Sequence, residues 1–141
     1  MNATLFLRIA SGLSLIQCVL HTVGGVFGSP KHSAEEIAVI ETMKSHRFDV
    51  MGSTRSYWDF LFGYGLFVTI DLVILTILFW QLAAFVKANP VSTRPIVALF
   101  FFNCVGVAIV SWTYFFIGPA VTQLLLAACL GSAFATAAES R

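Results

Sequence analysis

The chain has 141 residues, of which 58% are hydrophobic and 11% are charged, and its formal net charge is +1. The mean hydropathy of +0.88 lies far above the range of water-soluble domains. The composition therefore predicts a polytopic membrane protein and excludes a soluble catalytic domain. The near-neutral charge also excludes a basic surface for binding nucleic acid.

Four apolar segments are long enough to cross a bilayer, which takes a run of about 18 residues or more. None of them shows the alternation that a strand of a membrane barrel requires. The sequence therefore predicts an all-α integral membrane four-helix bundle, with residues 1–141 forming a single transmembrane domain. The predicted spans are residues 5–27, 57–86, 96–116 and 120–138.

The first predicted span carries a stripe of small and polar residues at three- and four-residue steps, which is typical of a helix face packed against other helices. Arg8 near its start is expected to extend its charged end to the membrane interface. His21 could exchange a proton, but a haem would need a second axial ligand at that depth. His32 and His46 both fall in the following loop, so a macrocycle at His21 is not favoured, and no metal site is predicted. The stripe contains Ser14, Gln17, Cys18, His21, Gly24, Gly25 and Gly28.

The loop between the first two spans contains a helix signal. Ser33 and Glu36 have the spacing of a capping box, and Ile37, Ile40 and Met43 then fall on one helical face. A short amphipathic helix is expected at about residues 33–46. It is either a connector that rests on the membrane surface or a lid over the bundle.

Asp71 lies near the middle of the second predicted span. A charge at the bilayer centre costs about 2.5–3.5 kcal/mol on insertion scales, so Asp71 is expected to face a partner, a cavity or a ligand. Tyr64 precedes it by seven residues and shares its helix face. Gln17 and Asn103 fall at a similar depth on the first and third spans, with His21 about one turn away.

These five residues predict a polar intramembrane pocket that binds a lipophilic ligand. Trp58 and Asp59, at the loop end of the second span, are expected at its mouth. Trp58 could equally be an interfacial anchor, and Asp59 could pair with Arg55 one turn earlier.

The connections between the later spans carry turn-forming residues. Pro90 and Pro95 are expected to bracket the second connection, and Gly118 with Pro119 to form the third. The last two helices are therefore predicted to be antiparallel neighbours. The second connection carries cations without acids, which favours a cytoplasmic location for this connection. Both termini are expected on the same side of the membrane as this connection, and so in the cytoplasm.

Two parts of the sequence resemble known proteins. The opening Leu7-Arg8-Ile9-Ala10 with Gly12, the polar end from His21 to Gly25 and the four spans resemble the small DoxX-like bacterial inner-membrane proteins. The segments 55–60 and 63–66 look more like an uncharacterised group of small four-helix bacterial proteins, and the long first loop departs from the compact DoxX plan. The resemblance implies an accessory role in a membrane redox system and transfers no catalytic residue.

Three functions remain open from the sequence. The first is a non-enzymatic accessory subunit, or a binder of a lipid or quinone-like molecule, with membrane lipids, a membrane protein complex or a homo-oligomer as partners. The second is an intramembrane acid/base enzyme, such as an isomerase of a lipophilic substrate, in which Asp71 or Asp59 exchanges protons with His21. The third is a carrier or proton pathway, although a single acid near the midplane provides few titratable groups for such a pathway. Thiol chemistry is disfavoured because the three cysteines all fall near the predicted midplane.

Overall fold

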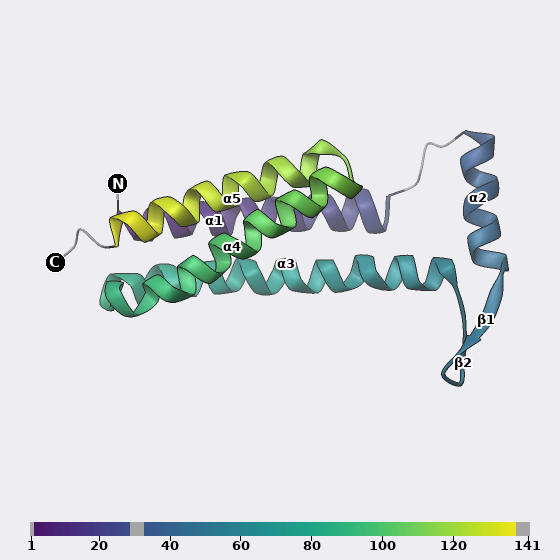
Figure 1. Ribbon diagram of the computed structural model, residues 1–141, viewed down its shortest axis with the longest axis horizontal. Coiled ribbons are helices and arrows are strands. Elements are labelled where there is room, and N and C mark those ends of the chain that lie inside the picture. The colour runs from purple at the N-terminus through teal and green to yellow at the C-terminus, as the bar shows by residue number, and fades with distance from the viewer. Residues whose placement is uncertain (1, 29–32, 138–141) are drawn as a thin grey trace. The chain divides into compact units, whose positions relative to one another are not determined.

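The computed structural model describes residues 2–28 and 33–137 of the chain. Four helical segments in this part are long and apolar enough to cross a membrane: Ala3–Val26, Tyr57–Ala88, Pro90–Tyr114 and Ile117–Thr136. The all-α prediction is confirmed for the described residues apart from one small hairpin. The elements in chain order (Figure 1) are α1 (Ala3–Val19), the π-helix η1 (Leu20–Val26), α2 (Ala34–Ser45), β1 (Arg47–Val50), β2 (Ser53–Ser56), α3 (Tyr57–Ala88), α4 (Pro90–Tyr114) and α5 (Ile117–Thr136).

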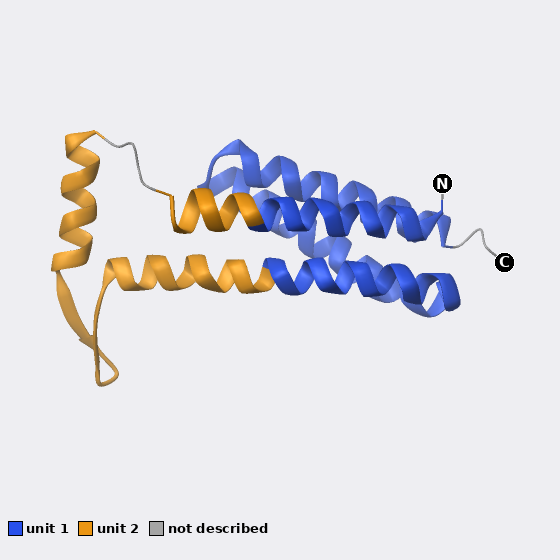
Figure 2. Cartoon of the chain, turned by 180° about the vertical axis from the view of Figure 1, so that it is seen from behind, with its two compact units in different colours: residues 1–18, 72–141 blue, residues 19–71 orange. Residues whose placement is uncertain are grey.

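The chain divides into two compact units (Figure 2). Unit 1 comprises residues 1–18 and 72–141, and unit 2 comprises residues 19–71. Unit 1 therefore contains most of α1, the second half of α3, and the whole of α4 and α5. Unit 2 contains η1, α2, the hairpin and the first half of α3.

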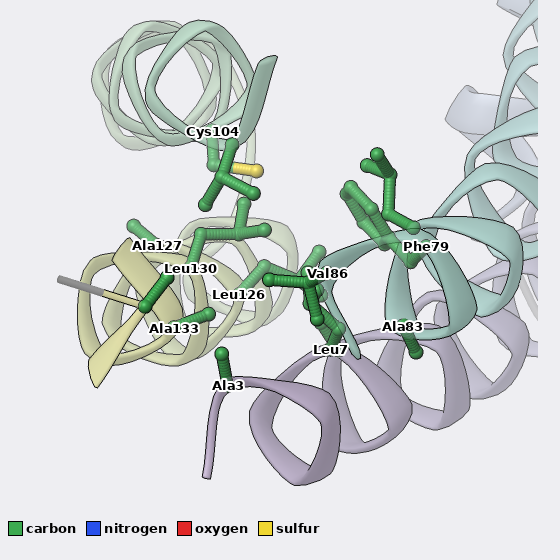
Figure 3. Packing of buried hydrophobic residues seen from close by; sticks show 14 residues of the cluster. Ala3, Leu7, Phe79, Ala83, Val86, Cys104, Leu126, Ala127, Leu130 and Ala133 are labelled. Atoms are coloured by element: carbon green, nitrogen blue, oxygen red, sulfur yellow. The ribbon is translucent and has the colours of Figure 1, made fainter. Parts of the chain in front are cut away.

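Unit 1 has one hydrophobic core to which all four of its helices contribute (Figure 3). Phe79 of α3 and Leu7 of α1 are both 0% exposed, and alanines fill many of the remaining positions. Small side chains allow helices to approach closely, which is the main source of packing energy between apolar helices in lipid. The buried members are Ala3, Leu7, Ala10, Phe79, Leu82, Ala83, Val86, Val97, Cys104, Leu126, Ala127, Leu130, Ala133 and Ala137.

The direction of the helices in unit 1 follows from this core. Ala3 at the start of α1 belongs to the same cluster as Val86 near the end of α3 and Ala133 near the end of α5. The first helix therefore begins at the end of the bundle where α5 finishes and where α3 connects to α4. This agrees with the prediction that both ends of the chain lie on the side of the second connection.

Helix α4 begins six residues earlier than expected, which corrects the predicted connection. Pro90 occupies the first turn of the helix, where its missing N–H would have had no partner in any case. Pro95 lies inside the helix. The Thr93 hydroxyl donates to the carbonyl oxygens of Asn89 and Pro90 at 2.8 and 3.1 Å, which satisfies acceptors in this turn. The two prolines belong to α4, and Asn89 alone separates it from α3.

The third connection also differs from its prediction. Gly118 and Pro119 lie in the first turn of α5, whose N-cap is Phe116. The chain turns at Phe115 and Phe116 instead, both in extended conformations. Proline is tolerated in the first helical turn for the same reason as in α4. The predicted antiparallel pairing is confirmed, since α4 and α5 make the closest helix contact of the structure.

In unit 2, the predicted loop helix is present as α2. The Ser33 hydroxyl accepts from the backbone N–H of Glu36 at 3.3 Å, and the Glu36 carboxylate accepts from the N–H of Ser33 at 2.9 Å. These two bonds confirm the capping box. None of the residues of α2 is fully buried, and on its expected apolar face Ile40 and Met43 are half-buried while Ile37 is exposed.

The sequence reading missed the hairpin that follows α2. Strands β1 and β2 pair antiparallel, with Val50 opposite Ser53. The two residues between them, Met51 and Gly52, have φ values of 48° and 80°. Positive φ at both central residues of a two-residue loop matches the twist of a hairpin. β1 does alternate polar and apolar residues, but over four residues only, and β2 contains no apolar residue, so the hairpin gives little signal in the sequence.

Candidate functional site

Asp71 lies on the outer surface of helix α3. Its side chain is exposed, and it makes no hydrogen bond or ion pair with any other described residue. Tyr64, Phe67 and Val68, which lie up to two turns before it, are 65%, 64% and 43% exposed. The prediction that Asp71 turns inward is therefore wrong for the isolated chain. We call the surface formed by Tyr64, Phe67, Val68 and Asp71 the Asp71 face.

The outward direction of this face has a simple geometric cause. The residues at 57, 64 and 71 do share one side of the helix, as their spacing predicts, but that side is exposed. The buried side is instead marked by Leu72, Phe79 and Val86, which follow the same seven-residue spacing one residue later. One residue turns an α-helix by about 100°. The predicted seven-residue spacing was correct, but the predicted inward side of the helix was wrong by one residue.

Asn103 on α4 shows the same offset of one residue. Its side chain is exposed, whereas the next residue, Cys104, is only 1% exposed and belongs to the core. Asn103 therefore does not line a pocket inside unit 1. A polar amide and a carboxylate thus lie on the outer surfaces of two apolar helices.

Gln17 is one of the predicted site residues that find an intrachain partner. Its Oε1 accepts a hydrogen bond from Nε2 of Gln123 at 3.1 Å, and Gln123 is only 4% exposed. Nearby on α1, the hydroxyls of Ser11 and Ser14 donate to the carbonyl oxygens of Thr76 and Leu72 at 2.8 and 3.3 Å. The sequence analysis missed Gln123, although it is the one amide in the last helix.

We expect Gln123→Leu to destabilise the chain by about 1–2 kcal/mol, because it leaves the Gln17 amide without its partner among apolar helices. The double variant Gln17→Leu/Gln123→Leu should recover most of this loss, since both polar groups are then removed. The free energy of unfolding in detergent, measured for the two single variants and the double, tests this. Losses that simply add in the double variant would contradict a direct bond.

His21 lies on the π-helix η1 in unit 2. Its Nε2 is 3.0 Å from the carbonyl oxygen of Gly65 on α3, and the Thr22 hydroxyl is 3.1 Å from that of Thr69. A side chain at Gly65 would place its Cβ 3.0 Å from Val26, so glycine allows this close approach. These contacts give His21 a structural role as a bridge between η1 and α3. Because a carbonyl oxygen only accepts, Nε2 must donate and is occupied.

The two residues predicted at the pocket mouth begin helix α3. The Asp59 carboxylate accepts from the N–H of Ser56 at 2.8 Å, and the Ser56 hydroxyl accepts from the N–H of Asp59 at 3.2 Å. Asp59 thus completes a second capping box. Trp58 is half-buried, and the ammonium group of Lys44 lies 5.1 Å from its ring centroid. Both residues have structural roles where the chain passes from the hairpin into the long helix.

A hollow lies between α4 and α5 in unit 1. Its volume is about 220 Å³, and it is lined by Ala98, Phe101, Phe102, Gly131 and Phe134. All of these are apolar, and none was predicted as a site residue. Within residues 2–28 and 33–137, there is no group of three His, Cys, Asp or Glu side chains that could hold a metal ion.

Comparison of the chain with models of protein families, with curated proteins and with solved structures gives no match. The likeness to DoxX-like proteins therefore stays a prediction, and the function has to be inferred from the residues of this chain.

Proposed function

We propose that this chain is a non-enzymatic accessory subunit of a bacterial inner-membrane complex, with its termini in the cytoplasm. In this proposal, the Asp71 face binds a transmembrane helix of another protein. The observation that carries it is the exposed, unpaired Asp71 among exposed apolar side chains.

The depth of Asp71 makes its exposure costly in a bilayer. It is close to the centre of a helix of 32 residues, Tyr57–Ala88, within about 3 Å of the midpoint along the axis. The hydrocarbon core around this position is about 30 Å thick. A carboxylate facing lipid there costs about 2.5–3.5 kcal/mol, and a hydrogen-bond donor on a partner helix would offset much of that cost.

The partner is inferred to carry a basic or amide side chain near the middle of its own helix. In this chain, the described cations of the long helices lie towards helix ends: Arg8, Lys87 and Arg94. Among its described residues, a second copy can therefore offer amides, hydroxyls and the His21 ring near that depth, but no lysine or arginine. A partner with a central Arg, Lys or His would bind the carboxylate more strongly, because charge-assisted hydrogen bonds are about twice as strong as neutral ones.

The contacts give less support to the other functions. Among the described residues, the apolar hollow gives weak support to a quinone-like ligand, because its volume of about 220 Å³ is below the usual range of roughly 300–1,000 Å³ for ligand pockets and it lacks a polar group to orient a ring. An acid/base enzyme needs two titratable groups near one substrate position. Here Nε2 of His21 is bonded to Gly65, and Asp59 caps a helix.

Photo-crosslinking in the native membrane tests the proposal. A photoreactive residue at Val68, on the Asp71 face, should give one discrete protein adduct. The same residue at Leu99, which is 71% exposed on α4, provides the control and should react with lipid. A crosslinked product with twice the mass of the chain would show that the Asp71 face binds a second copy of the chain, and it would contradict the proposed partner. Lipid adducts alone at both positions would overturn the proposal.

A further inference from the structure

Two arginines in unit 1 lack a counter-charge, although both are partly buried. The guanidinium carbon of Arg8 on α1 lies 3.3 Å from the ring centroid of Trp80 on α3. That of Arg94 on α4 lies 4.2 Å from the ring centroid of Phe134 on α5. Nη1 of Arg8 and Nε of Arg94 are buried without any hydrogen-bond partner. Each side chain is therefore held against an aromatic ring, with its charge unpaired by any described residue.

The described part of unit 1 does not supply the missing anion. The described part of unit 1, residues 2–18 and 72–137, contains Arg8, Lys87 and Arg94 but no Asp or Glu. Half-buried arginines normally have a hydrogen-bonded partner, because an unpaired charge in apolar surroundings is costly. An external anion at the exposed part of each arginine side chain would supply the missing counter-charge.

The positions of both arginines along their helices coincide with the expected edge of a bilayer core. The apolar segment from Ile9 to Val26 is about 27 Å long, and that from Pro95 to Tyr114 is about 30 Å. The hydrocarbon core is about 30 Å thick. Both helices start at the same end of unit 1, so both guanidinium groups are expected at the level of the lipid phosphates on one side.

We infer that this end of unit 1 binds the phosphate groups of anionic phospholipids through Arg8 and Arg94. Guanidinium groups bind phosphate oxygens with two parallel N–H donors, and the aromatic rings hold them in a fixed orientation. Basic pockets between transmembrane helices are known to recognise lipid headgroups in this way. The inference rests on the membrane location in the proposed function but not on the partner of Asp71.

Native mass spectrometry of the purified full chain in detergent tests this inference, with phosphatidylglycerol, phosphatidylcholine and inorganic phosphate as separate probes. The wild-type chain should retain phosphatidylglycerol in preference to phosphatidylcholine. Arg8→Gln/Arg94→Gln should weaken this binding by roughly tenfold or more. Arg8→Lys/Arg94→Lys should weaken it as well, because lysine keeps the charge without the paired donors.

Lys87→Gln is the matched control, since it removes one exposed charge at the same end of unit 1. It should leave lipid binding within about twofold of the wild type. An equal loss in this control would show attraction by net charge alone and overturn the site. Displacement of the lipid by inorganic phosphate would show that the site binds a free anion, and it would overturn the inference of a lipid ligand.

Glu139 lies outside the described residues, so Glu139→Gln must be measured too. Unchanged lipid binding in this variant supports the inference. A tenfold gain in lipid binding would show that the Glu139 carboxylate competes with the lipid for the two arginines, and it would overturn the inference. Failure of the chain to crosslink through Val68 would not affect these results. The two proposals are therefore tested separately.

Discussion

Replacing Asp71 with Leu should abolish the discrete crosslink from Val68 and reduce co-purification of the partner at least tenfold. Removing one member of a charge pair in an apolar interface leaves the other charge unpaired, which typically costs 3–5 kcal/mol. Membrane interfaces give smaller values, but a loss of only 1.4 kcal/mol already corresponds to a factor of ten. Quantitative mass spectrometry of the tagged chain, purified in mild detergent, measures the effect.

The series Asp71→Asn and Asn103→Leu makes the result specific. The amide of Asp71→Asn still accepts a hydrogen bond, so an intermediate loss is expected. Asn103→Leu removes another exposed polar side chain from the middle of an apolar helix, and it should leave the partner bound. Equal losses in Asp71→Leu and Asn103→Leu would point to a general change in the bundle and contradict the assigned face.

Phe79→Ala should give the largest loss of folding stability among single substitutions in unit 1. Phe79 is 0% exposed and contacts Phe100 edge to face, with a centroid distance of 5.3 Å. In water-soluble cores such a change costs about 3–5 kcal/mol. We expect about 2–3 kcal/mol here, because lipid is itself apolar and only the packing part of the energy is lost.

Phe85→Ala is the matched control for this prediction. It makes the same chemical change on the same helix, but Phe85 is 59% exposed. Its unfolding free energy, measured by titration with a denaturing detergent, should stay within about 0.5 kcal/mol of the wild type. Similar losses at both positions would show that the core of unit 1 does not depend on Phe79.

The helices could be predicted from the sequence because their signals are long and local. Continuous apolar runs identified all four long helices, and the capping residues Ser33 and Glu36 identified α2. The boundaries of α4 and α5 were wrong because Pro90 and Gly118 were interpreted as turn residues, although the first turn of a helix accepts them. The hairpin was missed because its strands have only four residues each and β2 contains no apolar side chain.

The candidate site was harder to predict, because the direction of a helix face depends on its neighbours. The spacing of Tyr64 and Asp71 correctly placed them on one side of α3, but apolar residues surround the helix on every side. In a soluble protein the polar side would face water and settle the direction. In a helix that is apolar all round, the sequence pattern does not show whether the side with Asp71 or the side with Leu72 faces the neighbouring helices.

The length of α3 has a consequence for how the chain would fit a membrane. Its 32 residues extend about 48 Å, and even a tilt of about 40°, the upper limit of common values, leaves roughly 37 Å along the bilayer normal. With α3 centred near Asp71, as proposed above, part of this excess would emerge at the Tyr57 end of the helix. There the helix would act as a stalk that lifts the attached hairpin into water. Such hydrophobic mismatch favours sorting of the chain into the thicker regions of a membrane.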